Sequence, residues 1–218
     1  MQNNKTITQV EVPEVVVQRL PIYVRILSQL LESHIEIISS HQLGELLQIT
    51  PAQIRKDLSY FGRFGKQGRG YNIQFLLDEL RQILGIDRAW KACLIGLGRL
   101  GRAIINYPGF SPEGFEIVAA FDNNVAQYNS NLGTITVQSM DEIAHTVKEK
   151  NISIGIVAVP SNQAQSVIDT LVESGITGIL NYAPIAPFAP KHIVMRNIDP
   201  VLSLQSMTFY MKENDEIN

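Results

Sequence analysis

The chain has 218 residues, which at a typical domain size of roughly 150 residues corresponds to one or two domains. Its 45% hydrophobic and 18% charged residues exclude a disordered chain. Because the chain has neither a long apolar run nor an apolar signal segment after Met1, we expect a cytoplasmic protein without membrane spans. A single cysteine, Cys93, excludes an internal disulfide, and the formal net charge of −3 argues against a broadly basic nucleic-acid-binding protein.

The charge is distributed unevenly along the chain. Residues 1–88 carry ten basic and nine acidic side chains, a net of +1, whereas residues 89–218 carry eight and twelve, a net of −4. Between Arg55 and Arg69 five basic residues accompany a single acid, Asp57, which gives a local charge of +4. Such a cluster indicates either an ordinary solvated surface or a contact with an anionic partner.

Two helices are predicted in the first 50 residues. An apolar pattern at helical spacing starts at Pro21 and ends near His34. Ser39 and Ser40 offer an N-cap for a second, short helix that closes before Ile49.

A third helix follows directly after a tight turn. Thr50 is its predicted N-cap, Pro51 occupies the first helical position, and Gln53 has the spacing to complete a capping box. The helix stops at Gly62. Because its N-terminal turns are the part of a recognition helix that contacts bases, this helix is the candidate for reading DNA.

A glycine-rich segment comes next. Gly62–Tyr71 has four glycines in its first nine positions, with basic and aromatic residues between them, which excludes a helix and favours a twisted hairpin whose tip needs positive φ. Asn72 then caps another amphipathic helix, which Gly85 terminates. The order of helix, helix-turn-helix and hairpin predicts a winged helix-turn-helix.

The second half of the chain alternates short apolar runs with helical patterns, which predicts βαβ units and an α/β fold with a doubly wound parallel sheet. The residues after Asp199 form a single, strongly apolar helix by their pattern. The predicted strands are residues 92–95, 116–121, 152–159, 178–181 and 193–195, and the predicted helices between them are residues 99–107 and 161–174.

The first βα turn carries a G-x-G-x-x-G motif, Gly96–Gly101. It follows a predicted strand and opens a predicted helix, and the next strand ends in Asp122, 21 positions after the last glycine. This context predicts a dinucleotide site in which the pyrophosphate sits on the helix N-terminus and Asp122 accepts hydrogen bonds from the ribose hydroxyls. Because the carboxylate would repel a 2′-phosphate and no arginine follows it, NAD(H) is favoured over NADP(H). The alternatives are a glycine turn that only packs a helix and an aspartate that only occupies a surface turn.

No catalytic machinery accompanies this nucleotide fold. The four histidines are scattered without a catalytic or metal-ligand spacing, and Cys93 lies within a predicted strand as a small core residue. No segment remains for a substrate domain. We therefore expect no catalytic residue, no metal site and no enzymatic activity.

Six segments together resemble the Rex family of redox-sensing transcriptional repressors, in order from about Pro13 to the end of the chain. The match implies a homodimer with an N-terminal winged helix that binds an inverted-repeat operator, a Rossmann domain that binds NADH or NAD⁺, and a C-terminal helix swapped between subunits. It implies release of the operator when NADH binds. The segments are Gln53–Gly62 (QIRKDLSYFG), Phe64–Gly65, Gly68–Tyr71, Gly96–Gly101, Phe121–Asp122 and Gly178–Pro184 (GILNYAP).

Three domains and three sets of site residues follow from this reading. The domains are residues 1–86 for DNA binding, 87–198 for NAD(H) and 199–218 for dimerisation. The cofactor-binding candidates are Gly96, Leu97, Gly98, Arg99, Leu100, Gly101, Asp122, Val159, Pro160, Asn181, Ala183 and Pro184. The DNA-binding candidates are Gln53, Arg55 and Lys56 for bases, Ser40, Ser59 and Tyr60 for phosphates, and Lys66 and Arg69 on the wing. Matching family positions imply a relay of the redox state through Arg25, Tyr107 and Asp199.

Two other functions stay open at this level. One is an NAD-dependent enzyme, which the missing substrate domain and proton-transfer group disfavour. The other is a repressor that uses the Rossmann fold for a different nucleotide or only as a dimerisation scaffold.

Overall fold

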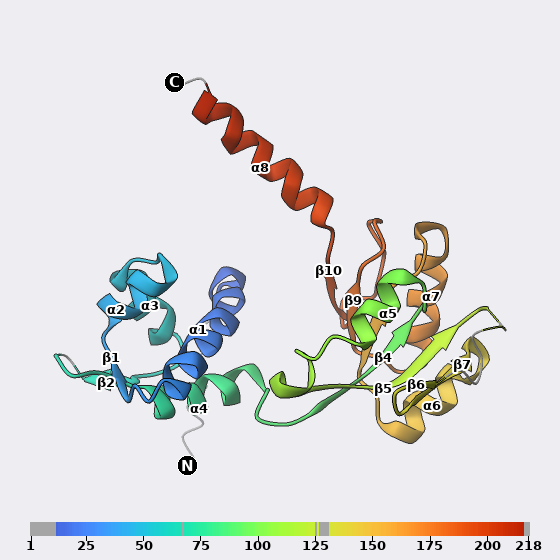
Figure 1. Cartoon of the computed structure of the whole chain (residues 1–218), viewed down its shortest axis with the longest axis horizontal. Coiled ribbons are helices and arrows are strands. Elements are labelled where there is room, and N and C mark those ends of the chain that lie inside the picture. The colour runs from blue at the N-terminus through green and yellow to red at the C-terminus, as the bar shows by residue number, and fades with distance from the viewer. Residues whose placement is uncertain (1–11, 67, 125, 127–130, 216–218) are drawn as a thin grey trace, which may run out of the picture. The chain divides into compact units, whose positions relative to one another are not determined.

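The computed structural model describes residues 12–66, 68–124, 126 and 131–215. The chain forms two compact units, residues 1–88 and residues 89–218 (Figure 1). No helix among the described residues is both long enough and apolar enough to cross a membrane.

The first unit combines four helices with a small sheet. Its helices are α1 (Glu14–Glu32), α2 (Ser40–Leu47), α3 (Pro51–Ser59) and α4 (Ile73–Leu84). Its strands are β1 (Ile37–Ile38), β2 (Gly65–Lys66) and β3 (Gly70–Asn72), which pair antiparallel in the order β1-β3-β2.

Helix α1 begins earlier than the sequence pattern predicts. It starts at Glu14 rather than at Pro21, which lies inside the helix. A proline in a helix interior costs about 3 kcal/mol. Here Val16 and Leu20, before the proline, are buried, Leu20 in the same core as Tyr23, and their burial stabilises the extra turns.

The caps of the other helices are largely as predicted. Ser39 and Gln42 form a capping box at the start of α2, and Asn72 caps α4, which ends at Gly85 with a φ of 68°. Thr50 caps α3, but Gln53 does not complete a capping box, because its side chain donates to Asp57 instead. This part of the prediction is wrong, since a carboxylate one turn along the helix is a stronger acceptor.

The core of the first unit lies between α1 and α4, with α3 packed against it. Leu20, Tyr23 and Leu27 of α1 are fully buried with Leu76 and Leu80 of α4. The predicted hairpin is confirmed: β2 and β3 pair across a turn in which Gly68 adopts a φ of 79°.

The second unit is built on a seven-stranded sheet with the order β10-β9-β8-β4-β5-β7-β6. All neighbouring strands are parallel except β6 and β7. The chain fills the sheet outward in one direction from β4 and then in the other direction from β8, so these two strands form the topological switch point. The strands are β4 (Trp90–Ile95), β5 (Phe115–Asp122), β6 (Asn131–Leu132), β7 (Ile135–Ser139), β8 (Ile154–Val157), β9 (Gly178–Asn181) and β10 (Val194–Asn197).

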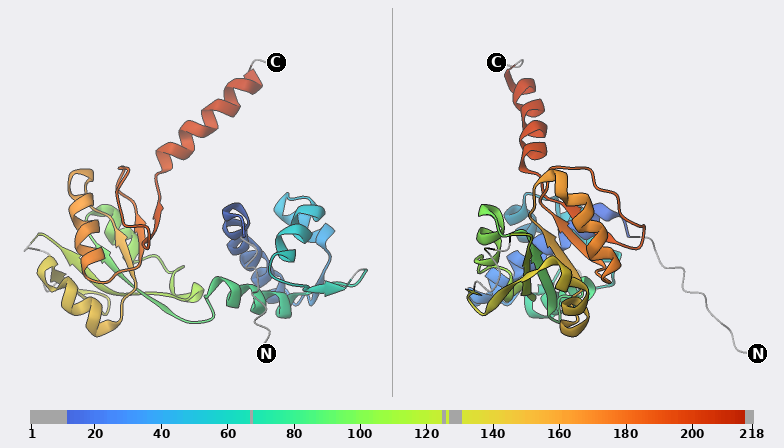
Figure 2. Two further views of the ribbon diagram at one scale, coloured as in Figure 1. Left: turned by 180° about the vertical axis from the view of Figure 1, so that it is seen from behind. Right: turned by 90° about the vertical axis from the view of Figure 1, so that its right-hand side faces the viewer.

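Helices cover both faces of this sheet (Figure 2). Helix α5 (Arg99–Ile105) packs on one face, where Ile104 contacts a buried cluster that includes Leu94. Helices α6 (Ile143–Lys150) and α7 (Ser161–Glu173) pack on the other. The predicted strands and the helices at α5 and α7 are confirmed, with shifted ends, whereas β6, β7 and α6 were not predicted because their short, mixed sequences carry no clear periodicity.

The last described element is α8 (Pro200–Asp215), which extends away from the sheet as a single helix (Figure 1). The apolar side chains of α8 lie exposed in the isolated chain. Val201, Leu202, Leu204, Met207, Phe209, Tyr210 and Met211 have exposed fractions between 54% and 65%.

Candidate functional site

The glycine loop between β4 and α5 has the geometry that its motif predicts. Gly96 has a φ of 92°, and a Cβ there would lie 2.6 Å from the carbonyl oxygen of Ala158. A Cβ on Gly101 would clash with the carbonyl oxygen of Gly96, so this glycine allows α5 to pack closely on the loop. Gly98 differs, because a Cβ there would meet no atom within 4 Å. The loop therefore presents an open backbone surface at Gly98, which is what a pyrophosphate requires.

Asp122 lies at the end of β5, beside this loop. One carboxylate oxygen accepts a hydrogen bond of 2.6 Å from the backbone N–H of Leu97, and the other accepts one of 2.7 Å from Asn124. The fold thus brings Asp122 to the glycine motif, 25 residues earlier in the chain. Its contact with a ribose stays a prediction.

A cavity of about 120 Å³ lies at the switch point, in front of β4 and β8. Gly96, Gly98 and Asp122 line it together with Val159 and Pro160, which follow β8. These five predicted residues therefore meet at one place. The reasoning from sequence missed Gln163 and Met140, which also line the cavity; Gln163 was within reach because it stands in the first turn of the helix after β8.

The segment after β9 has a different role in this structure. Asn181 is fully buried, and its amide bonds the backbone N–H and carbonyl of Ala183 and the side chain of Asn197. Asn181 therefore shapes the turn that leads to Pro184, which is exposed and does not line the cavity.

The remaining loop candidates divide by burial. Leu97 is buried, so it presents only its backbone, whereas Arg99 and Leu100 are exposed at the start of α5.

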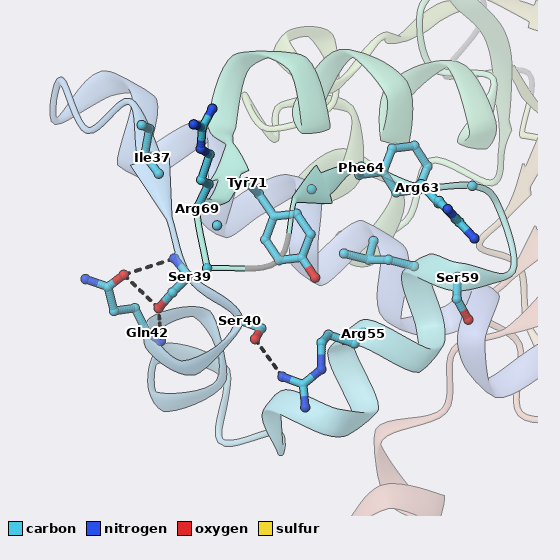
Figure 3. A pocket seen from close by; sticks show the side chains of 15 residues that line it. Ile37, Ser39, Ser40, Gln42, Arg55, Ser59, Arg63, Phe64, Arg69 and Tyr71 are labelled. Carbon is cyan, nitrogen blue, oxygen red and sulfur yellow. Dashed lines mark hydrogen bonds between the residues drawn. The ribbon is translucent and has the colours of Figure 1, made fainter.

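The first unit contains a second, larger groove between α2, α3 and the hairpin (Figure 3). Its volume is about 860 Å³, and Tyr71, which is 92% buried, forms part of its floor. Arg55, Arg63 and Arg69 line it together with three serines, and no acidic residue in the described part of the chain does. Cationic and hydroxyl groups on a concave surface are suited to an anionic ligand such as a phosphate backbone.

Arg55 is held at the edge of this groove. Its Nη1 donates a hydrogen bond of 2.8 Å to Oγ of Ser40, at the start of α2 (Figure 3). The pair therefore joins α3 to α2 and places a guanidinium and a hydroxyl side by side. This position favours a phosphate contact for Arg55, whereas the sequence predicted a base contact.

The other DNA-binding candidates lie on both sides of the groove. Ser59 and Arg69 line it, whereas Lys56 is exposed on α3 outside it and Tyr60 caps the end of that helix, half-buried. Lys66 belongs to β2, and its side chain lies outside the described residues. Sequence reasoning counted Arg63 in the basic cluster but missed it as a groove residue.

Gln53 does not line this groove, and its half-exposed side chain bonds back onto its own helix. Its Nε2 donates a hydrogen bond of 2.6 Å to the buried carboxylate of Asp57, which also binds Arg19. Burial alone would raise the pKa of Asp57, but hydrogen bonds from Arg19, Tyr23 and Gln53 hold it below its ordinary value. Asp57 is therefore a carboxylate at neutral pH.

Cys93 is fully buried within β4, and burial raises the pKa of its thiol to about 12. A neutral, inaccessible thiol is no nucleophile, in agreement with its predicted core position. Among the described residues, no group of three or more histidine, cysteine or acidic side chains is placed to hold a metal ion.

The three relay candidates belong to different units. Arg25 is exposed on α1 of the first unit. In the second unit Tyr107 follows α5 and stacks edge-to-face on Phe110, with a centroid distance of 5.4 Å, and Asp199 accepts a hydrogen bond from Val201 at the start of α8. Their coupling stays a prediction.

A helical unit with a basic groove, joined to a Rossmann-like sheet with an open glycine loop, defines a DNA-binding protein regulated by a dinucleotide. Two family models match the chain in agreement with this class: "Putative DNA-binding protein N-terminus" over residues 11–59 and "CoA binding domain" over residues 87–185. The chain is 48% identical to the redox-sensing transcriptional repressor Rex of Chloroflexus aurantiacus, over 94% of this chain and 96% of that protein. It belongs to the family of redox-sensing transcriptional repressors Rex, and it is a transcriptional repressor rather than an enzyme.

Solved structures agree with this assignment. The chain resembles the Rex-family repressor RSP in complex with β-NAD⁺ and operator DNA, with a TM-score of 0.89, 35% identity and coverage of 94% of this chain and 95% of that one. It also resembles RSP in complex with β-NADH, with a TM-score of 0.85, 33% identity and coverage of 95% and 97%.

Proposed function

We propose that this chain acts in the cytoplasm as a homodimer that binds an inverted-repeat operator and releases it when NADH binds. The observation that carries the proposal is the presence, in one polypeptide, of a basic groove beside α3 and an open glycine loop beside Asp122. The RSP structures, one with operator DNA and β-NAD⁺ and one with β-NADH, support the same pairing of ligands.

The first unit supports a winged helix-turn-helix. Helices α2 and α3 are joined by a short turn, and the β2–β3 hairpin stands beside α3 as the wing. In this arrangement the N-terminal turns of α3, with Gln53 and Lys56, enter the major groove. Arg55, Ser40, Ser59 and Tyr60 contact phosphates, and Lys66 and Arg69 on the wing approach the neighbouring minor groove.

The dinucleotide would lie across the carboxyl edge of the sheet. The pyrophosphate would contact the backbone of residues 96–101, with Arg99 and Leu100 at its edge. Asp122 would accept hydrogen bonds from the ribose hydroxyls. The nicotinamide half would extend past Val159 and Pro160 towards residues 181–184. The open space at Gly98 supports this placement, since it leaves the backbone accessible to the phosphates.

The terminal helix supports a swapped dimer. A helix that is apolar around its whole circumference is normally buried, whereas the apolar side chains of α8 are exposed in the isolated chain. A second copy of the chain is the natural partner, because one chain carries one recognition helix and a palindromic site needs two. We accordingly divide the chain into residues 1–86 for DNA, 87–198 for NAD(H) and 199–218 for the swap.

Release requires that NADH prefer one form of the dimer. A ligand with equal affinity for the DNA-competent and incompetent forms would shift nothing, however tightly it bound. Rotation of the two nucleotide domains would change the spacing of the recognition helices, with Arg25, Tyr107 and Asp199 relaying the state. By linkage, operator DNA must lower the affinity for NADH by the same factor by which NADH lowers that for the operator.

The decisive experiment measures operator binding at fixed salt across a series of NADH/NAD⁺ ratios, with an operator selected from random DNA. The expected result is loss of binding as the ratio rises. Operator binding that does not change with the ratio would overturn redox sensing. Operator binding that responds to NADPH alone would show that the Rossmann-like unit binds another nucleotide.

A further inference from the structure

Asp57 on α3 is a fully buried carboxylate with every acceptor position in use. Its Oδ2 accepts hydrogen bonds of 2.6 Å from Nε of Arg19 and 2.6 Å from the hydroxyl of Tyr23. Its Oδ1 accepts bonds of 2.7 Å from Nη2 of Arg19 and 2.6 Å from Nε2 of Gln53. Because a carboxylate has about four acceptor sites, this one is saturated.

Two of the three donor residues come from α1 and one from α3 itself. Arg19 and Tyr23 lie one turn apart on α1 and reach across to Asp57, 38 and 34 residues later in the chain. The guanidinium of Arg19 binds both carboxylate oxygens of Asp57, which fixes the orientation of the two groups as well as their distance. The recognition helix is therefore held in a set rotation against α1, at the turn that carries Gln53.

The network also determines which way the Gln53 amide points. Asp57 is ionised and can only accept hydrogen bonds, so Gln53 must direct Nε2 towards it and its carbonyl Oε1 elsewhere. Burial and the bond to Asp57 raise the pKa of Tyr23, which keeps that hydroxyl a donor as well. After these bonds, Gln53 retains Oε1 and one N–H.

Those two remaining groups are the pair with which a glutamine reads adenine. In the major groove adenine presents N6–H₂ as a donor and N7 as an acceptor, matching a carboxamide in one orientation only. A freely rotating amide loses this distinction. A fixed amide keeps it without having to be ordered on binding.

We propose that Asp57 is a positioning residue that orients the carboxamide of Gln53 and thereby sets a preference for adenine at one base pair of each operator half-site. This inference rests on the proposed function, since it requires that α3 enter the major groove. It assigns a role in sequence recognition to a buried acid that does not itself reach the DNA.

The test compares full-length variants on a panel of DNA duplexes in which each base pair of a selected half-site is changed in turn. Binding is measured by fluorescence anisotropy at one salt concentration. Gln53→Ala is expected to reduce discrimination at one A·T position by about 5- to 100-fold. Asp57→Asn, whose amide offers both donor and acceptor, is expected to reduce discrimination at the same position, and the double variant to lose no more there than either single variant.

Tyr23→Phe is the matched control. It removes a hydrogen bond to Oδ2 of Asp57 but leaves the bond from Gln53 to Oδ1 in place. We expect it to lower thermal stability and to leave the pattern of discrimination unchanged. A role of Asp57 in folding alone would instead make Asp57→Asn resemble Tyr23→Phe, with equal loss on every duplex, and this result would overturn the inference.

A second measurement uses the wild-type protein, in case Asp57→Asn does not fold. The side-chain amide proton of Gln53 that bonds Asp57 should exchange with solvent at least tenfold more slowly by NMR than the side-chain amide protons of Gln82, which is exposed on α4. Equal exchange rates would overturn the inference, as would unchanged discrimination in Gln53→Ala. A wild-type chain that selects no DNA sequence would overturn the proposed function itself, which distinguishes the two failures.

Discussion

The carboxylate of Asp122, at the end of β5, accepts a 2.6 Å hydrogen bond from the backbone N–H of Leu97 in the glycine loop. It therefore holds a fixed negative charge at the edge of the cavity in front of the switch point. A carboxylate in this place can accept hydrogen bonds from the ribose hydroxyls of NAD(H), and it repels the 2′-phosphate of NADP(H).

Asp122→Asn is therefore expected to weaken NADH binding by at least about tenfold while weakening NADPH binding less, because the amide carries no charge and does not repel the 2′-phosphate. Isothermal titration calorimetry with both nucleotides measures the two changes. Glu173→Gln, which removes an exposed acid from α7 away from the cavity, is the control for net charge. An unchanged NADH/NADPH affinity ratio would contradict the assignment of Asp122.

Two glycines of the loop are expected to respond oppositely to alanine. Gly98 has a φ of −65° and open space beside it, so Gly98→Ala should change the free energy of unfolding by less than about 0.5 kcal/mol and still impair NADH binding. Gly101→Ala places its Cβ against the carbonyl of Gly96 and should cost about 1–3 kcal/mol or more of stability. Urea unfolding measures the change in stability, and calorimetry measures the change in NADH affinity. An unchanged NADH affinity in Gly98→Ala would exclude a close approach of the phosphates to this glycine.

Arg55 and Lys56 are expected to contribute to operator binding in different ways. Arg55 is tied to Ser40 beside the groove, so Arg55→Ala should weaken binding to all sequences and reduce the slope of log K against log salt by about 1 per half-site. Lys56→Ala should cost about 1–3 kcal/mol and act mainly on sequence discrimination. Titrations at several salt concentrations, with specific and random duplexes, measure both. Identical behaviour of the two variants would refute this division.

The Arg19–Asp57 pair predicts how stability depends on pH. The folded-state pKa of Asp57 is below its ordinary value, so its contribution is present above about pH 4 and is lost as the pH falls through the lowered pKa. Arg19→Met should cost about 2–3 kcal/mol at pH 7, since it removes two charged hydrogen bonds. The stability difference from wild type should narrow below about pH 4 in urea unfolding from pH 7 to pH 3. If the difference in unfolding free energy between the two proteins did not change with pH, the charge of Asp57 would contribute nothing to stability.

The exposed apolar surface of α8 predicts a dimer that a single charge can disrupt. Phe209→Asp places a carboxylate on a helix that we expect to be buried by a second copy, where an unpaired charge is strongly unfavourable. Sedimentation equilibrium should then give the mass of one chain instead of two. Lys212→Ala, at the end of the same helix, should remain dimeric. A wild-type chain that sediments as a monomer would contradict the swap.

Local signals in the sequence determined much of this protein. Ser39, Asn72 and Gly85 mark helix ends because a cap depends only on residues within one turn, and these ends lie where they were predicted. The glycine motif predicted the loop for the same reason, since its three glycines act on their immediate backbone. The short strands β6 and β7 and helix α6 were not predicted from the sequence. They are stabilised by packing on the sheet, whereas their own sequences show no clear apolar periodicity.

Only the tertiary structure decided the contacts between distant residues. The hydrogen bond between Asp122 and Leu97 and the ion pair between Arg19 and Asp57 join positions that no periodicity relates. Buried beside Arg19, Asp57 also binds the Gln53 side chain, which was expected to complete a capping box. The starting charge of −3 likewise did not reveal a groove lined by arginines and serines. Net charge and local pattern are sums over neighbours in sequence, whereas a binding site is made by neighbours in space.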